Sequence, residues 1–201
     1  VILYLLEIQI IGGFMEIKKT NLQDCYLINY DKFCDERGYF APYYKYSEIT
    51  ENNLIDFQEI KQLSRSASSK GVLRGFHFQV APHAQSKIVE AICGTILDTV
   101  VDLRVDSPTF MQHQSFLLSQ DDNTQLLIPK GFGQSFLTLD EYNLVEYLTD
   151  HSFAPEYERG ILYNDPLLNI NWEEIFKTYG ITSPIISAKD QNHPRLTKKI
   201  N

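Results

Sequence analysis

Cysteine is scarce in this sequence, and its spacing argues against two common ways of stabilising a small fold. The three cysteines, Cys25, Cys34 and Cys93, lie far apart, and no two of them form a Cys-x-x-Cys pair. This pattern argues against a disulfide framework and a zinc cluster, and it indicates reduced thiols in a cytoplasmic protein. Neither disulfides nor a zinc site are needed to stabilise the fold, because 43% apolar and 12% aromatic residues can fill a core.

Basic residues are also few. Lys and Arg number 18 against 26 Asp and Glu, which gives a formal net charge of −8. Nucleic acids are therefore not expected as partners, since binding their phosphate backbone requires clustered positive charge. A small anionic ligand remains compatible, because a few local arginines can hold it.

Long apolar runs are missing too, apart from a short one at the start of the sequence. Residues 1–14 are mostly apolar but are too short to span a bilayer, and they have no basic start and no small-residue cleavage site. We therefore expect no membrane association. We treat residues 1–14 as an apolar leader of uncertain origin outside the fold, and residues 15–201 as a single cupin-like domain.

From Met15 onward the pattern is typical of an all-β protein. Short β-branched and aromatic runs alternate with turn residues about every ten positions, and no tandem repeat is present. The pattern predicts a double-sheet jelly roll, a cupin-like barrel with a ligand pocket in its mouth. Short helices are expected near residues 47–53 and 172–179. The expected strands are 25–30, 39–44, 57–66, 71–79, 87–93, 97–104, 112–118, 125–128, 133–138 and 143–150.

The stretch 71–79 is the most unusual of these strands. It places Arg74 and His77 in an apolar run that reads as a buried strand, where charge is costly unless it is paired. A lone histidine of this kind is more often a hydrogen-bonded core residue. The alternative is that the strand forms a pocket wall and that His77 transfers protons.

A second polar strand follows at 97–104. Alternation places Asp98, Asp102 and Arg104 on one face. We interpret Asp102 and Arg104 as a solvent-facing ion pair. Asp98 lies among aliphatic residues, where a place in a pocket wall is as plausible as a structural one.

A metal centre is the first possibility to test, because many cupins contain one. Histidine ligands on a strand usually stand two residues apart, but the residue two after His77 is Gln79. Ala81-Pro82 separates His83 from this strand, and the sequence isolates the other three histidines, which are His113, His151 and His193. The sequence therefore predicts neither a metal site nor a cofactor.

Without a metal, a histidine near a carboxylate, a lysine and a tyrosine could move protons. The Lys87 ammonium could stabilise an enolate oxygen, and the Tyr147 phenol could supply a proton from the opposite wall. Taken singly, Lys87 and Tyr147 are more often ordinary surface and core residues.

Several segments together resemble one enzyme family. They are Asp35-Glu-Arg-Gly-Tyr-Phe40, Gly71-Val-Leu-Arg-Gly-Phe-His-Phe-Gln79, Ala84-Gln-Ser-Lys87, Asp98-Thr-Val-Val-Asp-Leu-Arg104, Ser107-Pro-Thr-Phe110, Ile128-Pro-Lys-Gly-Phe132 and Ile186-Ser-Ala-Lys-Asp190. In this order and combination, the chain resembles the dTDP-4-dehydrorhamnose 3,5-epimerase family of deoxysugar biosynthesis.

The resemblance implies a metal-free jelly roll without a cofactor, a nucleotide-diphosphate sugar as substrate, and a homodimer that exchanges N-terminal strands. It implies inversion at C3, and at C5 in the double reaction, of a nucleotide-linked 4-keto-6-deoxyhexose. By matching positions, the implied catalytic residues are His77 as base, Asp190 as its orienting carboxylate, Lys87 facing the keto oxygen and Tyr147 as acid. The implied substrate-binding residues are Arg37, which would reach the partner's site, together with Arg74, Gln62, Asp98 and Gln134.

Two features depart from a simple match. Gln134 stands where the family usually has a histidine, and Ser64 replaces an amide residue. These changes leave open an epimerase acting at one carbon, a keto-isomerase on a related sugar, or an inactive binding protein. In addition, Arg74 and His77 are three residues apart, so they share a pocket only if the strand bulges, for which Gly75 is suited.

Overall fold

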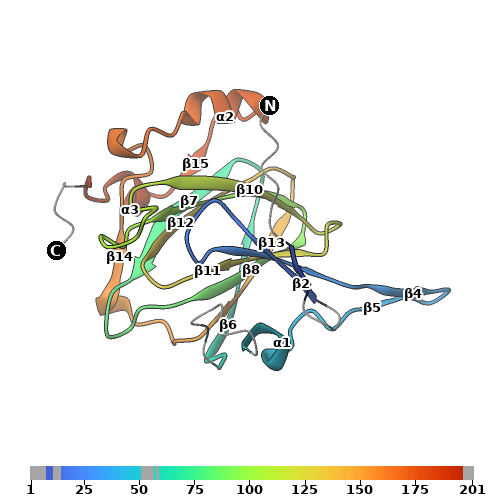
Figure 1. Cartoon of the computed structure of the whole chain (residues 1–201). Coiled ribbons are helices and arrows are strands. Elements are labelled where there is room, and N and C mark those ends of the chain that lie inside the picture. Colours follow the sequence, from blue (N-terminus) through green and yellow to red (C-terminus); the bar gives the residue numbers. More distant parts are fainter. Residues whose placement is uncertain (1–7, 11–14, 51–56, 58, 197–201) are drawn as a thin grey trace.

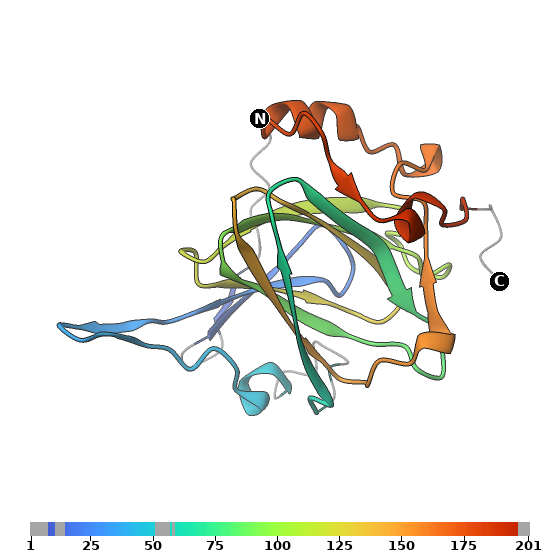
Figure 2. The same cartoon turned by 180° about the vertical axis from the view of Figure 1, so that it is seen from behind.

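Two large sheets account for most of the structure, a computed structural model that describes residues 8–10, 15–50, 57 and 59–196 (Figures 1 and 2). One sheet has the strand order β1 (Ile8–Ile10), β2 (Met15–Lys19), β3 (Tyr26–Tyr30), β11 (Thr124–Ile128), β8 (Lys87–Cys93), β13 (Asn143–Thr149) and β6 (Gln62–Ser68). The other has the order β10 (His113–Ser119), β9 (Thr95–Asp102), β12 (Phe132–Thr138), β7 (Val72–Gln79) and β14 (Glu158–Gly160), with β15 (Ile185–Ile186) parallel to β7. The predicted all-β, cupin-like jelly roll is confirmed.

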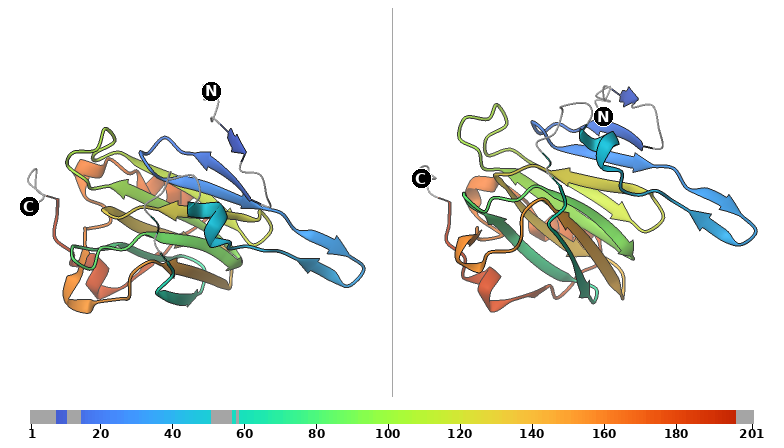
Figure 3. Two further views of the ribbon diagram at one scale, coloured as in Figure 1. Left: turned by 60° about the horizontal axis from the view of Figure 1, so that its bottom comes forward. Right: turned by 90° about the horizontal axis from the view of Figure 1, so that it is seen from below.

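The remaining elements lie around these sheets. A separate hairpin of β4 (Phe33–Asp35) and β5 (Gly38–Phe40) projects away from the barrel (Figure 3). The helices are short: α1 (Tyr46–Thr50), α2 (Trp172–Thr178), α3 (Ala188–Gln191) and the 3-10 turns η1 (Pro155–Tyr157) and η2 (Pro166–Leu168). Among the helices of the described residues, none has the length and apolar character needed to cross a bilayer.

The central strands of the two sheets are buried on both faces. Between them lies a core to which Val89 and Val145 contribute from one sheet and Val100 and Phe136 from the other. The C-terminal segment covers the outer face of the second sheet, where Trp172 of α2 belongs to a cluster with core residues of that sheet. This double burial explains why the central strands read as nearly continuous apolar runs rather than as alternating ones.

Double burial also corrects one expectation. Asp102 and Arg104 form the predicted ion pair, at 2.9 Å, but Asp102 is fully buried instead of facing solvent. The turn after β9 folds back over this carboxylate, so that the hydroxyls of Ser107 and Thr109 also donate hydrogen bonds to it. The carboxylate accepts five hydrogen bonds, four from the side chains of Arg104, Ser107 and Thr109 and one from the Arg104 backbone amide, which offset the cost of burying its charge.

Some element boundaries also differ from those expected. The strand expected over 57–66 begins at Gln62, and the helix expected over 47–53 is α1, with 51–53 outside the described residues. Within the segment assigned to the leader, Ile8–Ile10 form β1 and pair with β2, with Gln9 opposite Ile17. These three residues therefore extend the sheet instead of standing outside the fold.

The predicted bulge in β7 is present at Gly75. On β12, Gln134 and Phe136 are two residues apart, whereas their partners on β7, His77 and Arg74, are three apart, so β7 carries one extra residue. Gly75 has a φ of 107°, and a Cβ there would collide with the Gln134 carbonyl oxygen and lie 2.8 Å from the Ser135 Cα. Only glycine fits this position, and the bulge brings Arg74 and His77 to one cavity.

The substitution Gly75→Ala should therefore destabilise the protein strongly. Strain at positive φ adds to a clash with the backbone of β12, so we expect a loss of more than about 2 kcal/mol in the free energy of unfolding, measured in urea. Gly180→Ala is the matched control, because Gly180 also has a positive φ of 66° but has open space around it. It should cost only the conformational penalty of about 1 kcal/mol, and equal losses in the two variants would contradict the close packing at Gly75.

Candidate active site

A cavity of about 360 Å³ opens between the two sheets. Six residues named from the sequence line it: Gln62, Arg74, His77, Lys87, Gln134 and Tyr147. They come from β6, β8 and β13 of one sheet and from β7 and β12 of the other. The barrel thus brings together side chains that are up to 85 positions apart in the sequence, since Gln62 and Tyr147 belong to paired strands.

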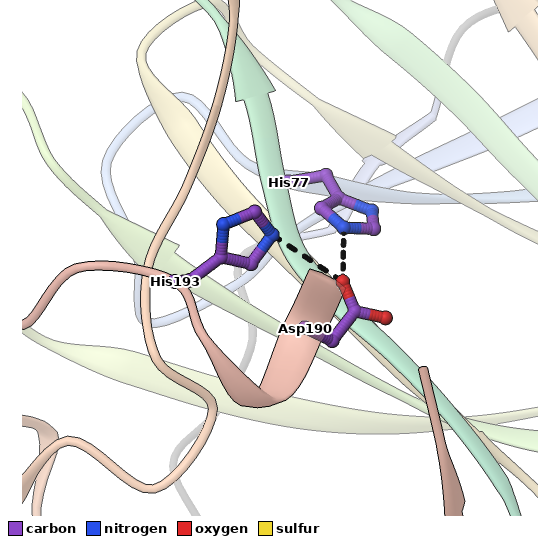
Figure 4. Close-up of side chains that lie close together, drawn as sticks. All are labelled: His77, Asp190 and His193. Atoms are coloured by element: carbon purple, nitrogen blue, oxygen red, sulfur yellow. Dashed lines mark hydrogen bonds and ion pairs between the residues drawn. The ribbon is translucent and has the colours of Figure 1, made fainter. Parts of the chain in front are cut away.

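His77 is hydrogen-bonded to Asp190 behind the cavity wall (Figure 4). The distance from His77 Nε2 to Asp190 Oδ1 is 2.6 Å, and Asp190 is only 3% exposed. Two features place Asp190 there. The parallel pairing of Ile185–Ile186 with β7 delivers α3 to this strand, and Ser187 caps the helix by accepting a hydrogen bond from the Asp190 amide.

The charge state of Asp190 defines the tautomer of His77. Burial opposes ionisation of Asp190, but the hydrogen bond from His77 and the histidine's charge outweigh it, so the pKa of this carboxyl lies below its ordinary value. An ionised carboxylate can only accept hydrogen bonds, so His77 Nε2 must donate. In neutral His77 the lone pair then resides on Nδ1, which becomes the basic nitrogen.

Lys87 and Asp98 are linked through the amide of Gln134. Lys87 Nζ donates to Gln134 Oε1 at 3.2 Å, and Gln134 Nε2 donates to Asp98 Oδ2 at 2.8 Å. Asp98 has no exposed surface, and its Oδ1 has no hydrogen-bond partner among the described residues. Asp98 therefore lies beneath the cavity wall and acts on the cavity through Gln134.

Burial shifts the pKa values of the two ionisable groups that Gln134 connects, Asp98 and Lys87. It raises the pKa of Asp98 to about 7, against the opposing effects of the Gln134 hydrogen bond and the Lys87 charge. It lowers the pKa of Lys87 to about 8, against the opposing charges of Asp98 and Glu158. Lys87 is therefore mostly cationic near neutral pH, and a cation in this cavity attracts a developing oxyanion.

Tyr147 lies on the sheet opposite His77. Burial raises the pKa of its phenol, partly offset by a hydrogen bond with Ser66 and by the charge of Arg74. The phenol therefore stays protonated at neutral pH and can donate its proton only to a strongly basic atom. The Nη2 of Arg74 donates a hydrogen bond to Ser68 Oγ at 3.1 Å, which orients the guanidinium.

Gln62 and Arg37 complete the set of residues named from the sequence. Gln62 is held in the cavity wall, where its Nε2 donates to Ser64 Oγ at 2.8 Å and its Oε1 accepts from the Phe153 amide at 2.8 Å. Arg37 is the exception. It lies in the turn of the projecting β4–β5 hairpin, exposed and paired with Asp35, and it does not line the cavity of its own chain.

Two of the three histidines interpreted as isolated, His151 and His193, are not isolated in space, and that expectation was wrong for them. The rings of His83 and His151 meet edge to face with centroids 4.8 Å apart. His193 Nε2 lies 3.3 Å from Asp190 Oδ1, and its ring meets that of His77 with centroids 5.4 Å apart (Figure 4). The i, i+3 spacing of Asp190 and His193 was an available signal for this contact.

Glu158 was also missed. It lines the cavity from β14 and pairs with Lys189 at 2.5 Å. Its strand is only three residues long, in a tail whose sequence pattern is irregular.

Asp98 should make stability depend on pH. Its pKa rises from 3.8 to about 7 on folding, so the stability that it contributes is complete below about pH 4 and is lost as the pH rises to about 7. We expect the free energy of unfolding of the wild type, relative to Asp98→Asn, to fall by about 3 kcal/mol between pH 5 and pH 8. Urea unfolding at the two pH values measures it. Asp121→Asn, at an exposed aspartate, is the control and should show no such trend; a pH-independent difference for Asp98→Asn would contradict the shift.

Comparison with known proteins agrees with the architecture. The family model described as dTDP-4-dehydrorhamnose 3,5-epimerase matches residues 19–198. The chain is 37% identical over 187 residues to the dTDP-4-dehydrorhamnose 3,5-epimerase of Salmonella typhimurium, covering 92% of this chain and 98% of that protein.

Two solved structures are similar over most of the chain. The dTDP-6-deoxy-D-glucose-3,5-epimerase of Legionella pneumophila, in complex with dTDP-4-keto-L-rhamnose, has a TM-score of 0.82 and 33% identity, covering 90% of this chain and 92% of that one. ChmJ of Streptomyces bikiniensis, a 3'-monoepimerase in complex with dTDP-quinovose, has a TM-score of 0.78 and 27% identity, covering 88% and 85%. With a family model that matches most of its length and a relative 37% identical to it, this chain belongs to the dTDP-4-dehydrorhamnose 3,5-epimerase family.

Proposed function

We propose that this protein is an isomerase that inverts the carbons next to the 4-keto group of a nucleotide-linked 4-keto-6-deoxyhexose, in dTDP-rhamnose and polysaccharide biosynthesis. One observation carries the proposal: His77, backed by Asp190, shares a cavity with the cationic Lys87 and the protonated Tyr147. A base, an oxyanion partner and an acid in one cavity are what proton transfer next to a ketone requires.

In the proposed mechanism, Nδ1 of His77 removes the proton from C3. The electrons of the broken C–H bond move into the C3–C4 bond, and the 4-keto oxygen becomes an enolate. The Lys87 ammonium stabilises this negative charge. Tyr147 then returns a proton to C3 from the opposite face, which inverts the carbon, and in the double reaction C5 follows the same sequence.

Two arginines, Arg74 and Arg37, are positioned in this proposal to bind the diphosphate of the substrate. Arg74 lines the cavity of its own chain. Arg37 would reach the site of a second subunit, in a homodimer that exchanges N-terminal strands. The projecting hairpin supports this assembly, because Phe33, Tyr39 and Phe40 are exposed large apolar residues that a partner would cover. Three unpaired cysteines support a cytoplasmic location, and the mechanism needs no metal or cofactor.

Gln134 favours a second candidate, inversion at only one carbon. An amide keeps the hydrogen bonds to Lys87 and Asp98, but it cannot take up or release a proton as an imidazole does. The similarity to a 3'-monoepimerase is consistent with this candidate. Nuclear magnetic resonance of the product formed in heavy water distinguishes the two, because deuterium at both C3 and C5 indicates the double reaction, whereas deuterium at only one of these carbons indicates the single one.

Removal of the base should stop proton exchange. In His77→Ala, we expect deuterium incorporation from heavy water into dTDP-4-keto-6-deoxyglucose to fall by about 10² to 10⁴-fold, the range typical of a lost general base. His83→Ala is the control, because His83 packs against His151 and does not line the cavity, and it should exchange at the wild-type rate. Exchange at that rate in His77→Ala would refute the proposed base.

Removal of the acid should separate exchange from inversion. In Tyr147→Phe, His77 can still remove the proton and return a deuteron to the same face, so exchange should continue while inversion falls at least about tenfold. Chiral analysis of the recovered sugar, alongside deuterium counting, measures both. Tyr142→Phe, at an exposed tyrosine, is the control, and undiminished inversion in Tyr147→Phe would remove Tyr147 from the mechanism.

A further inference from the structure

Three potential metal ligands converge behind the cavity wall. His77 Nε2, Asp190 Oδ1 and His193 Nε2 all lie within 4.8 Å of one another, and Figure 4 shows both rings directed at the same carboxylate oxygen. The distances to Asp190 Oδ1 are 2.6 Å from His77 and 3.3 Å from His193. The arrangement has one more nitrogen than a histidine–aspartate pair needs.

The Nε2 atom of His193 is buried, and its 3.3 Å ion pair with Asp190 does not have hydrogen-bond geometry. The side chain of His193 is only 10% exposed, and its Nε2 has no hydrogen-bond partner among the described residues, although it faces a carboxylate. Gly160 of β14 provides the space for this ring, because a Cβ there would collide with it. An unsatisfied polar atom held in this way requires an explanation, and a cation between the three atoms supplies one.

We propose that His77, Asp190 and His193 form a binding site for a divalent transition metal ion, best matched by Zn²⁺, and that the bound ion switches off the base. The inhibitory part rests on the proposed function; the binding part does not.

The donor set matches this class of ion. Two imidazole nitrogens and one carboxylate oxygen suit Zn²⁺, Co²⁺ and Ni²⁺ and do not suit Mg²⁺ or Ca²⁺, which prefer oxygen ligands. Tetrahedral ligands about 2.1 Å from zinc are about 3.4 Å apart, close to the separation of His193 Nε2 and Asp190 Oδ1 already present. His77 Nε2, at 2.6 Å from Asp190 Oδ1, must move away from the carboxylate to reach this separation, which it can do because the proton of their hydrogen bond leaves.

Access to the three ligand atoms is past the ring of His77, the most exposed of the three side chains. The side chain of His77 is 30% exposed, against 10% for that of His193 and 4% for that of Asp190. A water molecule that enters past this ring would complete a three-ligand zinc site.

The proton balance explains why binding would inhibit. When the ion takes the Nε2 lone pair of neutral His77, the proton leaves Nε2 and Nδ1 takes one up from solvent, so the net proton count of the ring does not change. Nδ1 then carries hydrogen and has no lone pair for the sugar carbon. With the metal on Nε2 and a proton on Nδ1, neither nitrogen of His77 can act as a base.

Binding is tested without substrate. Untagged protein, stripped with a chelator and titrated calorimetrically with ZnCl₂, should bind one ion per chain, and CoCl₂ should give the visible absorption bands of tetrahedral cobalt. His193→Phe keeps an aromatic ring and removes the ligand, and His193→Asn is a smaller alternative should the first variant fold poorly. Zinc affinity should fall at least about 100-fold in both, while His151→Asn, near the same cavity, should bind as the wild type does.

Inhibition is tested separately on the wild type and the same variants. Zinc should abolish deuterium exchange in the wild type and in His151→Asn, and a chelator should restore it, while the His193 variants should exchange with or without zinc. Absence of zinc binding by the wild type, or unchanged binding by the His193 variants, would overturn the site. Zinc binding that leaves exchange intact would overturn the inhibition alone, and zinc binding by a protein that exchanges no protons would refute the proposed function alone.

Discussion

The hydrogen bond between His77 and Asp190 is the interaction on which the rest of the site depends. It spans 113 positions of sequence and exists only because the two-residue strand β15 runs parallel to β7 and delivers α3 to the back of the cavity. The hydrogen bond from His77 offsets part of the desolvation of the buried carboxylate. In return it holds the imidazole in one orientation and one tautomer, so that a single nitrogen faces the cavity chemistry.

The second constraint is the cost of buried charge on the other side of the cavity. Asp98 and Lys87 are too costly to bury as separate ions, and the Gln134 amide connects them without bringing them into direct contact. Burial moves the two pKa values toward each other, to about 7 and about 8. The pair therefore has a low net cost near neutral pH, and the ammonium stays available to attract an enolate oxygen instead of being neutralised in a closed ion pair.

Local pattern was enough to predict most strands from Met15 to Thr149, because β-branched runs and turn residues carry that information within a few positions. Once the family resemblance had placed Arg74 and His77 at one pocket, their spacing also predicted an irregularity at Gly75, since a regular strand would direct them to opposite faces. Contacts between residues far apart in the sequence could not be predicted from local pattern. Asp190 was identified only through the family resemblance, and the burial of Asp102 depends on a turn folding back over it. The pairing of β1 was missed because an apolar segment at the start of the sequence carries no signal of its partner strand.

Gln134 shows how one substitution can keep an architecture and still alter its chemistry. The amide provides one acceptor and one donor in fixed relation, and both are used, toward Lys87 and toward Asp98. An imidazole could make the same two contacts, but it could also exchange its proton, which would connect the buried Asp98 to the cavity. With Gln134 in place, the hydrogen bonds between Lys87 and the buried Asp98 run through an amide, which does not titrate. The amide therefore separates Asp98 from proton exchange with the cavity, whereas His77 is in direct contact with a titratable group behind the wall, Asp190.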